Sequence, residues 1–199
     1  MITHFVSKEQ LLSERSNGAK FYSNLNESYD VRSRQPFSNE ITVFLSHKHD
    51  DGEILKNVIS MLKNLGINVY VDWMDEDMPK QTSGTTAVKI KQKIRSCRKF
   101  ILLATEGAIA SKWCNWELGY GDAHKFKKHI ALFQMKPPNT SDNAYVGSEY
   151  MSIYPYITYY DGTETYTNGK QISRGYYVRR YESDGKSYIT PLADWFKET

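Results

Sequence analysis

Residues 41–45 read Ile41-Thr42-Val43-Phe44-Leu45, a compact run of β-branched, aromatic and aliphatic residues. A run of this kind suits a strand that is buried on both faces, as in parallel sheets. The polar segment 46–52 follows, and apolar residues then recur at the spacing of one helix face, at Ile54, Val58, Met61, Leu62 and Leu65. Gly66 comes directly afterwards, where a helix C-cap is expected. The chain therefore predicts a strand, a polar loop, a helix and a stop, in that order.

The same alternation continues along the chain. Residues 68–72 form a second predicted strand, residues 87–94 indicate a helix, and residues 99–104 form a third strand. A helix that begins near Ser111 and a short strand at 130–133 follow. This pattern predicts a parallel sheet with helices on both faces and right-handed crossovers. Ligands bind beyond the carboxyl ends of such strands, which selects the loops after Leu45, Val71, Ala104 and Phe133.

The segments on either side of this core differ from it in composition. Residues 1–39 are polar, contain turn signals and include a short helical candidate at 8–15, so we expect an N-terminal arm. We expect the core to cover residues 40–135. Residues 136–199 are rich in tyrosine and contain three Asx-Gly pairs, which predict a small extension of β-hairpins with a short closing helix at 192–196.

Composition narrows the class of protein. The chain has 199 residues, of which 40% are hydrophobic, and its longest apolar runs are too short to cross a bilayer. We therefore expect a soluble, cytoplasmic protein with no membrane partner, in which the two cysteines are reduced thiols. The net charge of +3 is too small to predict nucleic-acid binding. The densest basic stretch, Lys125-Phe126-Lys127-Lys128-His129, has the pattern of a solvated helix end, with phosphate binding as the alternative.

The segment 111–118 carries the clearest chemical signal, Ser111-Lys112-Trp113-Cys114-Asn115-Trp116-Glu117-Leu118. Ser111 is a candidate N-cap, because its hydroxyl can accept a free N–H of the first helical turn. Trp113 and Glu117 are four residues apart and share a helix face, so an indole and a carboxylate are predicted to line one pocket wall. The alternative is an amphipathic helix with its tryptophans in the core and its glutamate in water. Glu117 is the candidate reactive group.

Other candidate residues follow the predicted strands. Ser46 and His47 come after the first strand and are candidates for contact with a phosphate or a ribose, with loop capping as the alternative. Asp72 ends the second strand and is a candidate for orienting a ligand hydroxyl, or for capping a turn. His47 and His49 lie beside two aspartates, but no further His or Cys follows at a recognisable metal-ligand spacing, so we predict no metal site.

At this level of detail the core resembles a TIR (Toll/interleukin-1 receptor) domain. Val43-Phe44-Leu45-Ser46 is similar to the opening box of the family, and Val69-Tyr70-Val71-Asp72 leads into a long loop with Pro79 that resembles the BB loop. Residues 91–103 resemble the helix that enters the central strand. Residues 111–118 resemble the Ser-x-Trp-Cys-x-x-Glu-Leu signature of catalytically competent TIR domains. The loop at 73–84 departs from the usual Pro-Gly-Glu pattern of the family. The resemblance implies a flavodoxin-like three-layer sandwich with a central parallel sheet.

The resemblance also implies an activity, namely cleavage of NAD+ at the nicotinamide–ribose bond with Glu117 as the essential residue. One carboxylate is chemically sufficient, because nicotinamide leaves a pyridinium cation as a neutral molecule and needs no general acid. The remaining requirement is to stabilise an oxocarbenium-like ribosyl cation, which a carboxylate behind aromatic walls can do. Trp73, Trp113 and Trp116 are the candidates for those walls.

The implied function is therefore that of a stand-alone bacterial TIR NADase or ADP-ribose cyclase. Such proteins are similar to the TIR components of anti-phage systems of the Thoeris type, in which a nucleotide product activates a separate effector protein. NAD+ is the expected substrate, no cofactor is expected, and self-association through TIR surfaces is implied by the family. Two alternatives remain from the sequence: a non-catalytic TIR interaction module, and an enzyme similar to nucleoside deoxyribosyltransferases that acts on a deoxynucleoside.

Overall fold

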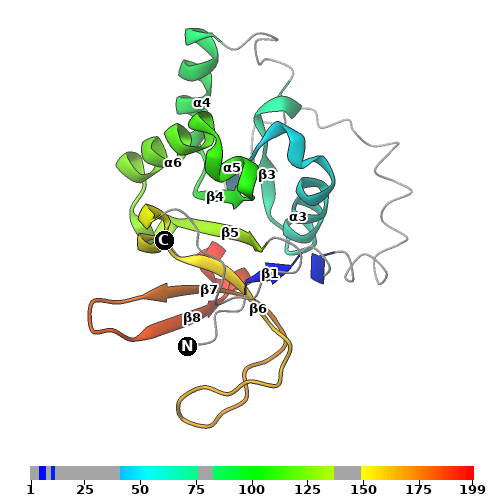
Figure 1. The fold of residues 1–199 in the computed structure, drawn as a ribbon, viewed down its shortest axis with the longest axis vertical. Helices are drawn as coiled ribbons and strands as arrows, with labels where there is room; N and C mark the ends of the chain where they lie inside the picture. The colour runs from blue at the N-terminus through cyan, green and yellow to red at the C-terminus, as the bar shows by residue number, and fades with distance from the viewer. Residues whose placement is uncertain (1–4, 8–9, 12–40, 76–82, 137–148) are drawn as a thin grey trace.

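One mixed sheet organises the protein in the computed structural model, which describes residues 5–7, 10–11, 41–75, 83–136 and 149–199 (Figure 1). Its strands occur in the order β3-β2-β4-β5-β6-β7-β8, and β1 pairs with the end of β5. The strands from β3 to β6 in this order run parallel, as does β1 to β5, and β7 and β8 are antiparallel to their neighbours. The strand bounds are β1 Val6–Ser7, β2 Thr42–Ser46, β3 Asn68–Tyr70, β4 Lys99–Ala104, β5 Ile130–Lys136, β6 Tyr156–Tyr160, β7 Gly175–Tyr181 and β8 Ser187–Pro191.

Helices cover both faces of this sheet. Figure 1 shows α4, α5 and α6 in green on one side of the strands and α3 in cyan on the other. The helix bounds are α3 Gly52–Asn64, α4 Gly84–Ser96, α5 Glu106–Ala110, α6 Lys112–His124 and α7 Leu192–Lys197. Short 3-10 helices lie between them, η2 His49–Asp51, η3 Asp72–Met74, η4 Lys127–His129 and η5 Glu149–Ile153. Among the described residues, no helix is long and apolar enough to cross a membrane.

Alternation along the strands divides the core into two layers. Val43 and Leu45 of β2 pack with α3 and α7, whereas Phe44 faces α4, α5 and α6. The Phe44 ring stacks on that of Phe100 in β4, with centroids 5.6 Å apart. Both faces of β2 and β4 are therefore dry, as the continuous apolar run predicted. The predicted three-layer α/β fold is confirmed.

The strand order creates a switch point between β2 and β4. The chain goes from β2 to β3 on one side, and then returns past β2 to β4 on the other. The connecting helices α3 and α4 consequently leave on opposite faces, and a crevice opens beyond the carboxyl ends of β2 and β4. Two of the four loops that the sequence selected, those after Leu45 and Ala104, lie at this crevice.

Most predicted elements of the core are present. Gly66 has φ +74° just after α3, and its N–H donates to Lys63 O, as expected for a glycine that ends a helix. The second predicted strand is shorter than expected, because Asp72 begins η3 instead of ending β3. The helical candidate at 8–15 lies outside the described residues except at Gln10 and Leu11, which are helical.

The part of the chain after residue 135 extends the central sheet. β6 joins β5 in parallel at Leu132–Tyr156, and β7 and β8 follow as a hairpin with Asp184 and Gly185 in its turn. Ile157 and Trp195 are buried in the same apolar layer as Val43, which explains why the sheet does not end at the expected boundary. The first residues of the chain also contribute, since Val6 pairs with Met135. The predicted closing helix is confirmed as α7.

Candidate active site

A buried serine–carboxylate contact lies at the switch point. Ser111 caps α6 by accepting the N–H of Cys114 at 3.3 Å, as the sequence predicted, and the helix then carries Glu117 to the end of β2. Ser46 is the last residue of β2, and its hydroxyl donates to Glu117 Oε2 at 2.5 Å. Both residues are almost inaccessible, with 1% and 2% of their surface exposed. Ser46 therefore faces the carboxylate, and not the solvent as a direct ligand contact would require.

Burial changes the acid–base chemistry of this carboxylate. The loss of solvent raises the pKa of Glu117 from 4.5 to about 8, and the negative charge of Asp72 acts in the same direction. Hydrogen bonds from the side chains of Ser46 and Trp113 favour the ionised form and oppose this pKa shift. Glu117 is therefore mostly neutral near pH 7 in the unliganded protein, and a nearby positive charge would favour its ionised form.

A cavity of about 410 Å³ lies next to this contact. It is lined by residues of the loop after β2, by one residue each from η3 and α4, and by the start of α6: His47, Lys48, His49, Asp72, Thr86, Ser111, Trp113 and Cys114. Glu117 is not among these lining residues. Trp113 and Cys114, which precede it on α6, and His47, which follows Ser46, line the cavity, so the Ser46–Glu117 contact is next to residues of this wall.

His47 and Asp72 face each other in the cavity wall. The His47 Nδ1 lies 3.1 Å from Leu45 O, and since a carbonyl only accepts, Nδ1 carries the proton. The other ring nitrogen, Nε2, is 3.9 Å from Asp72 Oδ1. The Asp72 side chain retains 32% of its exposure and is therefore accessible to a ligand hydroxyl. The structure thus brings together these two predicted residues at the carboxyl ends of neighbouring strands.

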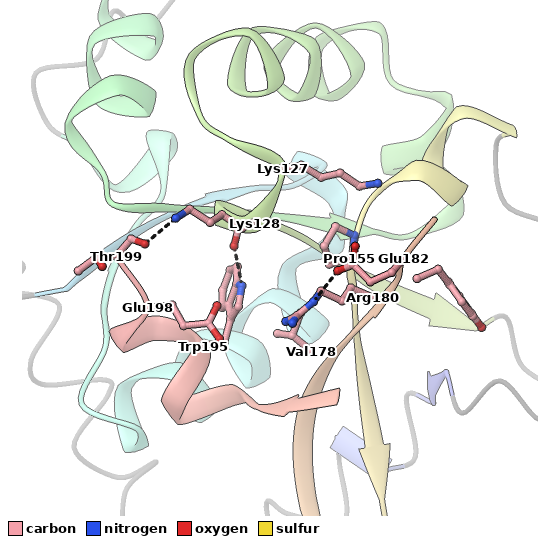
Figure 2. Close-up of a pocket in the computed structure, with 10 residues that line it drawn as sticks. Lys127, Lys128, Pro155, Val178, Arg180, Glu182, Trp195, Glu198 and Thr199 are labelled. Carbon is pink, nitrogen blue, oxygen red and sulfur yellow. Dashed lines mark hydrogen bonds and ion pairs between the residues drawn. The ribbon is translucent and has the colours of Figure 1, made fainter. Parts of the chain in front are cut away.

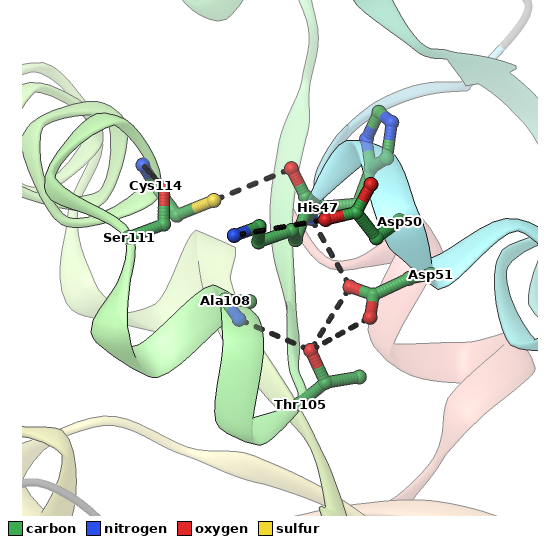
Figure 3. Close-up of polar contacts among 8 residues, drawn as sticks. His47, Asp50, Asp51, Thr105, Ala108, Ser111 and Cys114 are labelled. Carbon is green, nitrogen blue, oxygen red and sulfur yellow. Dashed lines mark hydrogen bonds and ion pairs between the residues drawn. The ribbon is translucent and has the colours of Figure 1, made fainter.

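A second set of polar contacts holds the loop after β2 in place (Figure 3). Cys114 Sγ donates to His47 O at 3.2 Å, which ties α6 to the loop. Asp51 accepts the Lys48 N–H at 3.1 Å and the Thr105 hydroxyl at 2.9 Å. Thr105 in turn caps α5 by accepting the Ala108 N–H. Sequence reasoning missed Thr105 and Thr86, because neither belongs to a local pattern that distinguishes it from an ordinary helix-start threonine.

The tryptophan candidates separate in the structure. Trp113 lines the cavity, whereas Trp116 packs between Trp113 and Tyr120, with ring centroids 5.0 and 6.0 Å away. Lys91 of α4 places its ammonium 5.6 Å from the Trp116 ring, so this indole belongs to the α4–α6 contact and not to the cavity wall. Trp73 lies in η3, but its side chain is outside the described part of the structure, as is the loop at 76–82 with Pro79.

Comparison with known proteins assigns the family. A family model described as "TIR domain" matches residues 43–167. The "Probable 3' cyclic ADP-D-ribose synthase ThsB'" of Bacillus cereus is 31% identical over 58% of this chain and 59% of its own length. The "Putative cyclic ADP-D-ribose synthase TIR2" of Cytobacillus dafuensis is 30% identical over 47% of this chain and 24% of its own. The "Probable 2' cyclic ADP-D-ribose synthase TcpO" of Methanobrevibacter olleyae is 26% identical over 57% of this chain and 33% of its own length. The chain thus spans less than two thirds of each of these relatives.

Two solved structures were also matched. The TIR domain of the Toll-related receptor TRR-2 from Hydra magnipapillata aligns over 51% of this chain and 75% of its own, with a TM-score of 0.40 and 18% identity. The TIR domains of the activated Roq1 resistosome align over 47% of this chain and 56% of their own, with a TM-score of 0.37 and 22% identity. The family model covers more than half of the 199 residues and includes β2 through β6. The chain belongs to the TIR domain family.

Proposed function

We propose that this TIR protein cleaves NAD+ at the nicotinamide–ribose bond and converts the remainder into an ADP-ribose product, cyclic or linear. The observation that carries the proposal is the buried Ser46–Glu117 contact beside a cavity at the switch point of the sheet. The three relatives are each named as cyclic ADP-D-ribose synthases, and this supports NAD+ as the substrate class.

Cleavage of the nicotinamide–ribose bond creates a positive charge that Glu117 can stabilise. When the bond between the ribose C1′ and the pyridinium nitrogen breaks, the electron pair goes to nitrogen and nicotinamide leaves as a neutral molecule. The positive charge moves to the ribosyl C1′ and its ring oxygen. An ionised Glu117 beside that cation stabilises it electrostatically in a site from which water is largely excluded. Capture by a hydroxyl or the adenine of the same molecule gives a cyclic product, and capture by water gives ADP-ribose.

Substrate binding itself would ionise Glu117. The pKa of about 8 belongs to the unliganded protein, in which burial disfavours the charged carboxylate. A nicotinamide cation in the neighbouring cavity adds a positive charge, which favours the carboxylate form. The group thus becomes negative where a cation is bound, and the substrate contributes to the activation of the site.

We assign supporting roles to the other residues. Ser46 is a positioning residue, because its hydroxyl orients the Glu117 carboxylate. Trp113 supplies an aromatic wall, and Asp72 and His47 are placed to contact ribose hydroxyls or phosphates. Trp73 and Trp116 also stay candidates for substrate contact, and the Trp116 ring lies between Trp113, which lines the cavity, and the α4 side.

The proposal extends to the biological setting. We place the reaction in the cytoplasm, in agreement with two cysteines that are buried free thiols in the structure. The nucleotide product would be sensed by a separate effector protein in an anti-phage system of the Thoeris type. Self-association through TIR surfaces would complete the site, and no cofactor other than the substrate NAD+ is required.

Product analysis tests the reaction class. We expect the purified full chain, incubated with NAD+ at high protein concentration, to release nicotinamide and to form a product with the mass of ADP-ribose or of ADP-ribose less one water. The lower mass identifies cyclisation. Deoxynucleosides should be left intact. Turnover of a deoxynucleoside but not of NAD+ would replace the proposal with a deoxyribosyltransferase, and turnover of neither would favour an interaction module.

A further inference from the structure

A second cavity, of about 660 Å³, lies at the opposite edge of the sheet from the candidate active site (Figure 2). Three cationic side chains line it, those of Lys127, Lys128 and Arg180, and part of its wall is apolar, formed by Pro155, Val178 and Trp195. Lys127 and Lys128 precede β5 and Pro155 precedes β6, so the cavity is at the amino edge of these parallel strands. The six residues of β4 alone separate the two edges by about 20 Å.

The positive charge in this cavity is only partly neutralised. Arg180 pairs with Glu182 at 2.9 Å, and Glu198 also lines the cavity. The ammonium of Lys128 donates at 2.7 Å to an oxygen of Thr199, the last residue of the sequence. Lys127 forms no ion pair with any residue that the structure describes. Lys127 is therefore the cation of the wall for which the described residues offer no ion-pair partner.

A buried lysine behind the wall adds to this charge. Lys99 is 0% exposed, and its ammonium lies 4.6 Å from the centre of the Trp195 ring. The ammonium is 3.0 Å from His129 Nδ1, and burial together with the nearby lysines lowers the pKa of His129 to about 4, so this imidazole is a neutral acceptor. Within the described ranges no carboxylate is in ion-pair distance of Lys99, and the charge of Glu198, which also lines the cavity, acts on it from further away. Burial lowers the pKa of Lys99 to about 8 while the charge of Glu198 opposes this shift, and an anion in the adjacent cavity would further favour the charged lysine.

We propose that this cavity binds a small phosphate-bearing molecule. Its phosphate groups would lie against Lys127 and Lys128, and an apolar ring would lie against Val178 and Trp195. Lysines bind phosphate as point charges, and the field of Lys99 reinforces them. The basic stretch at 125–129 would thus take part in ligand binding and would not be only a solvated helix end. This site is independent of NAD+ cleavage, because none of its residues lines the active-site cavity.

Indole NMR gives a readout specific to this cavity. The Trp195 Nε1–H donates to Lys128 O at 2.9 Å, whereas Trp113 lines the active-site cavity, so the two indole resonances report on separate sites. We would titrate the ¹⁵N-labelled Glu117→Gln protein, in which turnover is prevented, with pyrophosphate, ADP-ribose or ATP. The Trp195 resonance should shift at millimolar concentration or below. A shift with pyrophosphate assigns recognition to phosphate alone, and a shift with only the two nucleotides adds the ring.

Charge variants identify the groups that bind. Lys127→Ala with Lys128→Ala should weaken the interaction reported by Trp195 about tenfold, because two charge-assisted contacts are lost. Lys127→Arg with Lys128→Arg should retain it, and this pair keeps the test decisive if the alanine pair is unstable. Lys56→Ala on α3 is the matched control for the loss of an exposed lysine.

Three results would overturn the proposal. The first is a Trp195 resonance that none of the three probes moves. The second is an affinity that is unchanged in the alanine pair. The third is a shift confined to Trp113, which would place the binding at the active-site cavity alone. None of these outcomes depends on whether the protein cleaves NAD+.

Discussion

Glu117 combines near-complete burial with a polar partner, and this makes its protonation state the variable that controls the proposed reaction. The unliganded carboxyl has a pKa of about 8, chiefly because it is desolvated. Since only the ionised form stabilises a ribosyl cation, kcat/KM for NAD+ should rise about tenfold per pH unit below about pH 8 and level off above it. The rise of kcat with pH should occur at lower pH than that of kcat/KM, because the bound pyridinium cation favours the ionised Glu117 carboxylate in the enzyme–substrate complex.

The same measurement on a Ser46→Ala variant tests the positioning role. Ser46 donates to the ionised carboxylate and lowers its pKa, so removing the hydroxyl should move the kcat/KM limb to higher pH. An unchanged midpoint in this variant would contradict the assigned role. A kcat/KM that is flat from about pH 6 to about pH 9 in the parent protein would show that Glu117 is not the group that titrates.

The raised pKa of Glu117 also predicts how stability depends on pH. The folded carboxyl stays protonated up to about pH 8, whereas the unfolded one ionises near its ordinary value of 4.5. The folded state therefore binds more protons between these values, and its stability falls as pH rises through this window. The Gln side chain does not titrate, so the free energy of unfolding of Glu117→Gln should not fall in this window. Relative to the parent protein, it should therefore increase by up to about 4 kcal/mol between about pH 5 and about pH 8. Urea unfolding at both pH values measures this difference, and a pH-independent difference would contradict it.

At the scale of the element, two glycines of α6 should respond differently to replacement by alanine. A Cβ at Gly121 would lie 3.3 Å from the ring of Phe100, which is completely buried in β4, whereas a Cβ at the exposed Gly119 would meet no atom within 4 Å. Gly119→Ala should raise the free energy of unfolding by about 1 kcal/mol, since alanine is the better helix former. Gly121→Ala should gain less or lose stability, because α6 must move away from the sheet. Thermal melts of the two variants check this, and equal gains would show that α6 does not pack closely on Phe100.

The elements that sequence reasoning found share strong local signals. The strand at 42–46 contains the apolar run Val43-Phe44-Leu45, and α6 has a cap at Ser111. α5 was missed because five residues at Glu106–Ala110 are too few to show a period. β6 was expected to belong to a hairpin extension, but it pairs with β5 in parallel. The sequence of a strand does not indicate its parallel partner, because that partner is distant along the chain.

The candidate site shows the same limit. Ser46 and Glu117 were each selected from local patterns, Ser46 from its place after a strand and Glu117 from its motif. Their contact joins residues 71 positions apart, and no local spacing indicates it. The turn of Trp116 toward α4 and the cavity lining by Thr86 likewise depend on how two helices pack, which the sequence alone does not specify.

At the scale of the whole molecule, the sheet links the core to the tyrosine-rich region that follows it. Leu192, Trp195 and Phe196 of α7 are buried in the same apolar layer as Leu45 and Ile101. A chain that ends at residue 148 would expose this layer and the edge of β5, so we expect it to aggregate or to lack a cooperative unfolding transition. Circular dichroism melts would check this. A soluble fragment that melts cooperatively would show instead that residues 149–199 form a separable unit.

The central claim is that the Glu117 carboxylate carries NAD+ cleavage. Nicotinamide release by the full chain, compared among the parent protein, Glu117→Gln and the exposed control Glu106→Gln, tests it most directly. We predict that release falls by at least about a hundredfold in Glu117→Gln, as is typical when one electrostatic stabiliser of a transition state is lost, and is unchanged in Glu106→Gln. Release that persists at the parent rate in a folded Glu117→Gln protein would contradict the account.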